Sequence, residues 1–272
     1  MSFDIIEVSN EWGRLIQLYE FQLGTTIWRY CTGPVDRIAG GHRYTSCPIS
    51  DDGIKQKGDA SSDTMNVTVP SDIGVAQVFI GTPPSAPMYL RIKRTHEGDN
   101  QVLMAYAGEI TQVNFPTPGM AKMVVLPLSA TMNREGLRLG WQRTCPYALY
   151  DPMTCRVNKA DFATDAVIIS AQGDVVQALA FGDLPNGRLD GGYLEWDHPV
   201  RGKEMRGIVE HVGDSVRMFG LADGLYYGLA VKAYPGCNLT SSACHNVFNN
   251  LNNYGGFPHM PGKSPFDGNP VF

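Results

Sequence analysis

Four of the six cysteines form two pairs, and these pairs constrain the fold more than any other feature of the sequence. Cys145 and Cys155 are separated by nine residues, and Cys237 and Cys244 by six. Each pair lies among prolines and turn residues, and a long strand-like stretch separates the pairs. Turns leave backbone N–H groups outside sheet ladders, where they can point at sulfur and offset the charge of a metal–thiolate centre. We therefore expect the pairs to converge and tie the two ends of a domain together.

The spacing alone leaves the occupant of such a site open. Structural zinc usually has closely spaced cysteine knuckles, so the wider gaps count against zinc without excluding it. Two disulfides would suit an exported protein, but the first residues, MSFDIIEVSN, have no basic-then-apolar signal character, so we expect synthesis in the reducing cytosol. An iron–sulfur cluster tolerates irregular gaps because its inorganic core sets the geometry. Cluster, zinc and unligated thiols all remain possible at this point.

The remaining two cysteines have a simpler interpretation. Cys31 and Cys47 lie in strand-like runs beside bulky apolar residues, which favours buried thiols. Around the first pair, Trp141, Tyr147 and Tyr150 are predicted to shield a metal site from water, although an ordinary apolar core would use the same residues.

Composition favours β structure. The 30 glycines and 18 prolines interrupt the chain too often for long helices, and 43% hydrophobic against 18% charged residues indicates an ordered globular protein. A net charge of −5 argues against a general nucleic-acid-binding surface. No apolar run is as long as a membrane-spanning helix. The sequence therefore predicts a mainly β protein.

The first lobe, residues 1–140, is expected to be a small antiparallel β-barrel or sandwich. A short helix is predicted over residues 73–80, with Ser71 or Asp72 as its N-cap. Alternating and β-branched runs predict strands over residues 14–23, 25–31, 40–50, 64–69, 88–94, 101–113 and 121–129.

The second lobe, residues 141–272, opens with the first cysteine pair and continues as a meander. A C-terminal helix is predicted to begin at Ser241 or Ser242 and to stop at Gly255, and the tail over residues 256–272 is expected to be extended. Strands are predicted over residues 163–169, 174–181, 192–196, 205–211, 215–218 and 228–234.

A recognisable pattern surrounds the cysteines. The C-terminal segment reads Pro-Gly-Cys, a short gap, Cys, Phe-x-Asn, Asn-x-x-Gly-Phe-Pro and Pro-Gly. Its residues here are Pro235, Gly236, Cys237, Cys244, Phe248, Asn250, Asn253, Gly256, Phe257, Pro258, Pro261 and Gly262. An upstream element, Cys-x-x-x-Leu-Tyr-Asp-x-x-Cys, is formed by Cys145, Leu149, Tyr150, Asp151 and Cys155. This pattern resembles baseplate hub proteins of long, non-contractile phage tails and of gene transfer agents, whose relatives include the tail-tip protein of phage lambda.

The resemblance implies a structural virion protein with a tail-tube-like barrel lobe and a second lobe that carries the cysteines. Relatives coordinate a [4Fe–4S] cluster through four such cysteines, so it implies Cys145, Cys155, Cys237 and Cys244 as cluster ligands, with zinc as the alternative. Cys31 and Cys47 are not part of the pattern and stay predicted as buried thiols.

The resemblance also implies a place and partners. It predicts a tail-tip location in the virion after assembly in the host cytoplasm, as a homotrimer, without membrane insertion. The implied neighbours are a distal tail protein, the tape measure protein and a central fibre or receptor-binding protein, with DNA passing through the lumen during ejection. No catalytic activity is expected. A thiol-dependent cell-wall hydrolase, with Cys145 or Cys244 as nucleophile, and a zinc-stabilised binding module remain the alternatives.

Overall fold

The protein is mainly β, as predicted, and is built from two compact units. The computed structural model describes residues 8, 15–54, 64–97, 101–133 and 139–260. Unit 1 comprises Met1–Arg134 with Asp197–Glu204, and unit 2 comprises Glu135–Trp196 with Met205–Phe272. The predicted lobe boundary at residue 140 stays a prediction, because residues 134–138 are not among those described. Within the described ranges no helix has the length and apolarity needed to cross a membrane.

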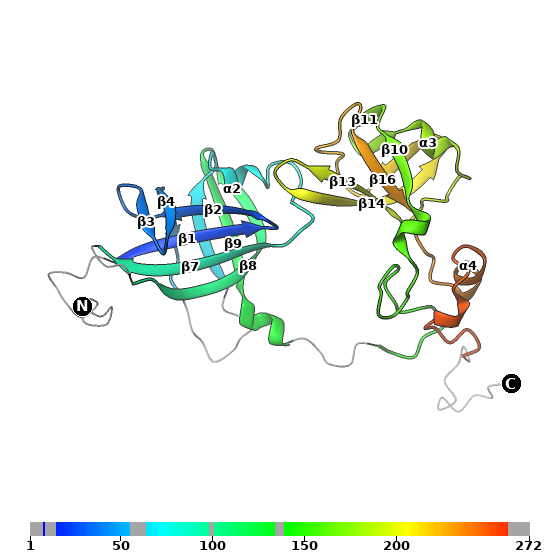
Figure 1. The fold of residues 1–272 in the computed structure, drawn as a ribbon, viewed down its shortest axis with the longest axis horizontal. Coiled ribbons are helices and arrows are strands. Elements are labelled where there is room, and N and C mark those ends of the chain that lie inside the picture. Colours follow the sequence, from blue (N-terminus) through cyan, green and yellow to red (C-terminus); the bar gives the residue numbers. More distant parts are fainter. Residues whose placement is uncertain (1–7, 9–14, 55–63, 98–100, 134–138, 261–272) are drawn as a thin grey trace. The chain divides into compact units, whose positions relative to one another are not determined.

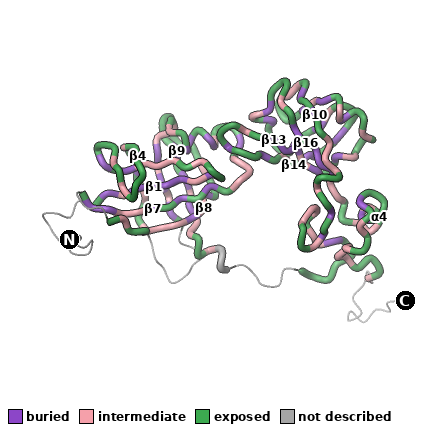
Figure 2. The backbone as a smooth tube through the Cα atoms, in the orientation of Figure 1, coloured by how far each residue is buried: buried purple, intermediate pink, exposed green. Residues whose placement is uncertain are grey.

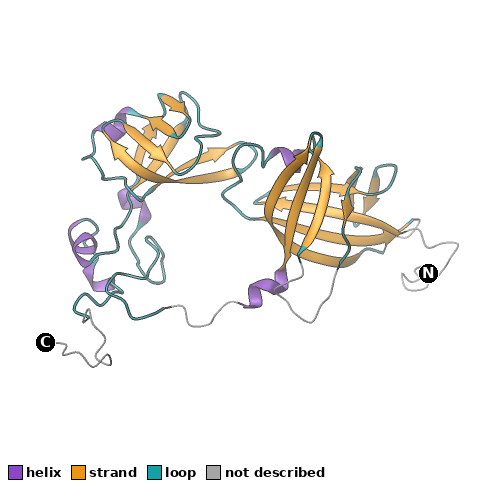
Figure 3. Cartoon of the chain, turned by 180° about the vertical axis from the view of Figure 1, so that it is seen from behind, coloured by secondary structure: helices purple, strands orange, loops and turns teal. Residues whose placement is uncertain are grey.

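Unit 1 is a curved nine-stranded sheet with the order β3-β4-β2-β1-β7-β8-β9-β6-β5. Figures 1 and 3 show it curled into half a barrel. Its strands are β1 (Leu15–Leu23), β2 (Thr26–Cys31), β3 (Arg37–Ala39), β4 (His42–Ser46), β5 (Ser50–Asp51), β6 (Met65–Pro70), β7 (Met88–His96), β8 (Leu103–Thr117) and β9 (Met120–Pro127), followed by the 3-10 helix η1 (Leu128–Asn133). The predicted sheet is antiparallel, but β2 and β4 pair in parallel, with Tyr30 opposite Thr45.

Alternate side chains of β1 belong to two different hydrophobic cores of unit 1. Tyr19, Phe21 and Leu23 are buried on one face, in a cluster that contains residues of β6, β7 and β9. Ile16 and Leu18 point to the other face, where they pack with Cys31 and Tyr44 in a smaller cluster. Successive side chains of a strand alternate between faces, so both faces of β1 are covered. Figure 2 shows this buried stripe along the central strands.

Glu20 is the buried charge on the second face of β1. Its carboxylate accepts hydrogen bonds from Arg29 Nε at 2.9 Å and from the Tyr44 hydroxyl at 3.0 Å, and pairs with Lys93 Nζ at 2.7 Å. Burial alone would raise the pKa of Glu20, but the hydrogen bonds from Lys93, Arg29 and Tyr44 outweigh it and lower that pKa to about 2.

The predicted helix over residues 73–80 is shorter than expected. It is α2 (Gly74–Gln77), whose N-cap is Ile73 and carries no side-chain cap, so the predicted caps Ser71 and Asp72 were wrong. The chain tightens after Gln77, because the N–H of Phe79 bonds to the carbonyl of Ala76 at 3.1 Å, three residues back. Such i→i+3 bonds end the α-helical geometry early.

Most of a seven-stranded sheet with the order β10-β16-β13-β14-β15-β12-β11 belongs to unit 2, while the end of β13 and the start of β14 fall in Asp197–Glu204 of unit 1. The strands of this sheet are β10 (Thr164–Val167), β11 (Ser170–Gln172), β12 (Val175–Gln177), β13 (Tyr193–His198), β14 (Gly202–Val212), β15 (Ser215–Met218) and β16 (Ala230–Tyr234). The end strands β10 and β11 are consecutive in sequence. Ile168 N–H bonds to Leu229 O at 3.0 Å and Ile169 N–H to Gln177 O at 2.8 Å, which extends both ladders. The run 164–172 therefore closes the sheet on itself and protects its edges.

A core of large side chains fills unit 2. Leu194, Trp196 and Val216 belong to it, and so does Phe181, which is fully buried. The predicted strand over residues 174–181 ends at Gln177, and its second half is α3 (Leu179–Gly182). That short helix places Phe181 in the core. The residue pattern over 174–181 predicted one continuous strand and did not indicate this helix.

Candidate metal centre

The structure brings the four predicted cysteines together. Cys145, Cys155, Cys237 and Cys244 all line one small cavity in unit 2. All four are free thiols. Cys145, Cys155 and Cys244 are buried and Cys237 is half-buried. The two pairs therefore converge in space.

Two segments form the walls of this cavity, residues 141–158 and 235–260, and we call them the cysteine module. Backbone hydrogen bonds join the segments: Cys145 N–H donates to Leu239 O, and Phe257 N–H to Gln142 O, each at 2.9 Å. The Tyr150 hydroxyl adds a bond to Pro235 O at 3.0 Å. These bonds hold the first cysteine pair against the second. Figure 3 shows the loops of the two segments side by side in unit 2.

Backbone strain is concentrated in the cysteine module. Among the residues that the structure describes, four non-glycine residues have positive φ, and all four lie here: Tyr150 (66°), Arg156 (60°), Leu239 (61°) and Asn249 (47°). A left-handed conformation costs a residue with a Cβ about 1–2 kcal/mol. Strain of this kind is kept mainly at functional sites, where the surrounding structure imposes it. At Leu239 the unusual backbone aims its N–H at Cys237 Sγ, 3.4 Å away.

Burial and neighbouring sulfur atoms raise the pKa of two of the four thiols, Cys237 and Cys244. Burial raises the pKa of Cys237, and the neighbouring Cys145 and Cys155 raise it further, while the Leu239 N–H lowers it. Burial also raises the pKa of Cys244, with Cys237, Cys155 and Cys145 adding to the effect. A group of thiolates needs positive charge or N–H donors nearby, so this is a place where a bound metal centre would relieve repulsion.

Aromatic side chains shield the cavity, though not the predicted set. Tyr147 lines it as expected, together with Phe248 and Tyr254, which the sequence reasoning missed. Tyr150 packs with Phe248 outside the lining. Trp141 is 78% exposed and packs against Phe257 with ring centroids 4.5 Å apart, so its predicted shielding role was wrong.

Cys244 is placed by a short helix, α4 (Ser241–Asn246). The N-cap is Thr240, so the predicted caps Ser241 and Ser242 were wrong. The Thr240 hydroxyl accepts a hydrogen bond from Ala243 N–H at 3.2 Å. The helix stops at Asn246, well before Gly255, and a separate 3-10 turn, η3 (Leu251–Asn253), follows. The left-handed Asn249 separates the two, because positive φ interrupts a right-handed helix. Pro261, Gly262 and the predicted extended tail beyond residue 260 lie outside the described residues.

The identity of any bound group is not decided by these side-chain positions. In the described part of the chain, no group of three or more His, Cys, Asp or Glu side chains is arranged so that it could hold a metal ion. The convergence of the cysteines is therefore a structural finding, and their role as ligands stays a prediction.

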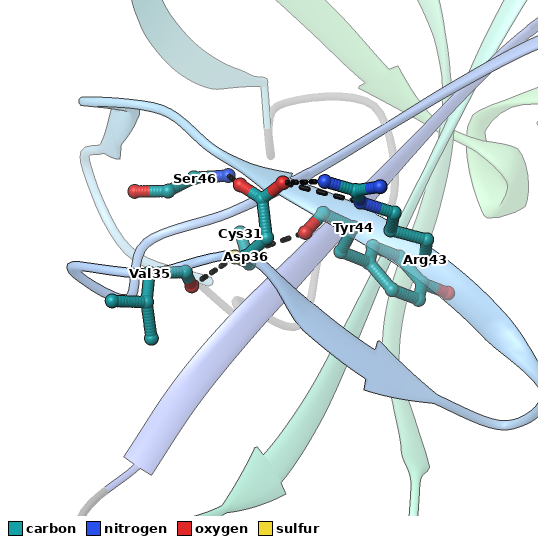
Figure 4. A network of polar contacts seen from close by, with 6 residues as sticks. All are labelled: Cys31, Val35, Asp36, Arg43, Tyr44 and Ser46. Atoms are coloured by element: carbon teal, nitrogen blue, oxygen red, sulfur yellow. Dashed lines mark hydrogen bonds and ion pairs between the residues drawn. The ribbon is translucent and has the colours of Figure 1, made fainter.

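Cys31 and Cys47 are buried thiols, as predicted. Cys31 lies in the polar network of Figure 4, where its Sγ is 3.7 Å from both Val35 O and Tyr44 O. The Cys47 N–H bonds to Cys31 O at 3.0 Å, yet the two side chains belong to different hydrophobic clusters of unit 1. The cysteines of unit 1 thus fill cores.

Comparisons with known proteins find a family model that matches part of the chain and a solved structure with the same fold. A family model described as phage conserved hypothetical protein BR0599 matches residues 187–264, a part that contains Cys237 and Cys244. A chain from the virion of a native gene transfer agent particle has the same fold, with a TM-score of 0.72 and 18% sequence identity over 95% of this chain and 96% of that chain. No curated protein matches the sequence.

Proposed function

We propose that this chain is a structural protein of a phage or gene-transfer-agent virion, located at the tail tip as a baseplate hub. The observation that carries the proposal is the convergence of four free cysteines, from two distant segments, on one cavity. The fold shared with a gene-transfer-agent virion chain over nearly the full length of both supports it, as does the match to a phage-conserved family model.

The cysteine module would hold a [4Fe–4S] cluster through Cys145, Cys155, Cys237 and Cys244. The donors are of the right chemical type for a cluster, because four thiols line the cavity and N–H groups of Leu239 and Asn250 lie near sulfur. A single zinc ion with Zn–S bonds of about 2.3 Å would require much tighter clustering than a polynuclear core, whose irons each take a different cysteine. Zinc remains the alternative occupant.

The cluster would act as a cross-link. Joining Cys145 to Cys237 closes a loop of about 90 residues, which by chain entropy removes on the order of 4–5 kcal/mol of freedom from the unfolded chain. The residues of the module then need only hold their positions, exclude water and supply N–H donors. A rigid hub at the end of a tail needs this stability more than it needs electron transfer.

The remaining parts of the proposal concern assembly. The hub would form a homotrimer, contact a distal tail protein and the tape measure protein above, and contact a central fibre or receptor-binding protein below. DNA would meet it only in passage through the lumen during ejection. The net charge of −5 suits a conduit that must not retain phosphate. We propose no catalytic activity.

Anaerobic purification tests the metal centre. We expect brown protein with about four irons and four sulfides per chain, and Cys155→Ser should lose the iron. Cys47→Ser is the matched control, because it alters a buried thiol of unit 1 and should keep the iron. Colourless protein with one zinc would instead support a binding module, and metal-free protein with one hyper-reactive thiol would support the hydrolase.

Imaging of the intact particle tests the location. Antibody labelling or a map of purified virions should place the chain at the tail tip, and particles without it should fail to deliver DNA. Virions that contain no trace of the protein would contradict the structural role, whatever the metal content.

A further inference from the structure

One side chain connects the two cysteine pairs directly. The Asn250 amide Nδ2 donates to the carbonyl oxygen of Cys155 at 2.6 Å and lies 3.9 Å from the Cys155 sulfur. The backbone of the same residue contacts Cys244 twice: Asn250 N–H donates to Cys244 O at 2.9 Å, and Cys244 Sγ donates to Asn250 O at 3.2 Å. Asn250 therefore contacts one cysteine of each pair.

The orientation of this amide is set by a neighbour. Asn253 Nδ2 donates to Asn250 Oδ1 at 2.6 Å, which turns the Asn250 NH2 group towards Cys155. Asn250 is also the N-cap of η3, but its side chain makes no capping hydrogen bond there. An asparagine at an N-cap usually accepts from the first turn of its helix. Here the side chain is committed to Cys155 instead.

We propose that Asn250 is a positioning residue for the metal centre, which holds Cys155 next to Cys244 and donates an N–H to the Cys155 thiolate. This inference rests on the proposed metal-binding function. Cys145, Cys155, Cys237 and Cys244 would hold the cluster as thiolates, with their protons released to solvent. The Cys244 S–H···O bond to Asn250 would then be lost, whereas the Asn250 N–H···S contact to Cys155 would become stronger, because a thiolate is a better acceptor than a thiol.

The test compares Asn250→Ala with Asn252→Ala in the full chain, reconstituted anaerobically with iron and sulfide. Asn252 is the matched control, since it is an exposed asparagine of the same turn. In competition with a chelator, we expect Asn250→Ala to hold iron about 10–100-fold more weakly than wild type, the usual loss of metal affinity when such a partner is removed. The reduction potential of any iron retained should also become more negative, because a hydrogen bond to sulfur stabilises the reduced cluster. Asn252→Ala should match wild type in both.

A measurement on the metal-free protein separates this inference from the proposed function. Alkylation of Cys155, followed by peptide mass spectrometry, should be faster in Asn250→Ala than in Asn252→Ala because the loop around Cys155 is released. If wild type takes up no iron, the proposed function fails, and this comparison then decides only whether Asn250 positions Cys155. Equal alkylation rates, equal iron loss, or a variant that unfolds the whole of unit 2 would each overturn the positioning role.

Discussion

At the scale of single residues, two glycines of the cysteine motif are required by close packing. A Cβ on Gly256 would lie 2.6 Å from Arg143 O and 2.7 Å from the carbonyl carbon of Thr144, and both are backbone atoms that cannot rotate away. A Cβ on Gly236 would overlap the backbone of Asp190 and Gly191. The two glycines therefore allow the segments of unit 2 to approach each other.

Gly256→Ala should destabilise unit 2 by about 1–3 kcal/mol, the usual cost of overpacking. Chemical denaturation of the full chain, with near-UV circular dichroism as the signal, measures it. Gly140→Ala is the matched control, since nothing lies within 4 Å of its Cβ position. Equal stability of the two variants would contradict the argument.

Because Glu20 is buried and ion-paired, we expect the stability of the protein to depend on pH. The Glu20 pKa of about 2 in the folded protein lies below the value of about 4.3 in an unfolded chain. The ionised Glu20 carboxylate therefore adds its full contribution to the free energy of unfolding when the pH is above the unfolded pKa, and this contribution is lost as the pH falls towards 2. It amounts to about 3 kcal/mol. In urea titrations between pH 6 and pH 2.5, wild type should lose more stability than Glu20→Gln.

The control for this prediction is Glu210→Gln. Glu210 pairs with Arg217 at 2.7 Å, but the two side chains are 53% and 50% exposed. Such surface pairs contribute little, so the acid sensitivity of this variant should equal that of wild type. A Glu20→Gln protein with the acid profile of wild type would show that another carboxylate dominates.

At the scale of elements, the cysteine module has very little core of its own. Its cluster of buried residues contains only Cys155, Val157 and Phe248, and one of these is a proposed ligand. Its helix α4 has six residues, too short to be stable without tertiary contacts. The module should therefore depend on the metal centre that we propose it holds, as small metal-stabilised domains do.

Removal of the proposed metal centre should loosen this module and leave the sheets intact. After chelation, hydrogen exchange should become faster in residues 141–158 and 235–260, while β1 and β14 should exchange as before, because their cores contain no ligand. Mass spectrometry with proteolytic fragments resolves these regions. Uniformly faster exchange over the whole chain, or none anywhere, would contradict a module-specific role.

At the scale of the whole molecule, two separate cores predict two unfolding transitions. Phe21 is fully buried in the large cluster of unit 1, and Phe181 is fully buried in that of unit 2. Phe21→Ala and Phe181→Ala should each cost about 3–5 kcal/mol, and each should lower a different transition in calorimetry. A single transition, shifted equally by both variants, would show that the units unfold together.

The sequence by itself determined the mainly β class and most strand positions, because period-two alternation and glycine–proline punctuation are local signals. It also identified the four cysteines that line one cavity, because cysteines among turns form a rare pattern. Helix ends were less predictable: Thr240, and not Ser241 or Ser242, caps α4. Which of the adjacent hydroxyl side chains becomes the N-cap depends on the backbone path between the preceding strand and the helix.

Only the tertiary structure decided how the module is held together. The bond from Ile168 N–H to Leu229 O in the unit 2 sheet, the bond from Cys145 N–H to Leu239 O and the amide of Asn250 beside Cys155 all join residues far apart in sequence. No local pattern contains such information, because strain and long-range hydrogen bonds are imposed by segments that meet only after folding.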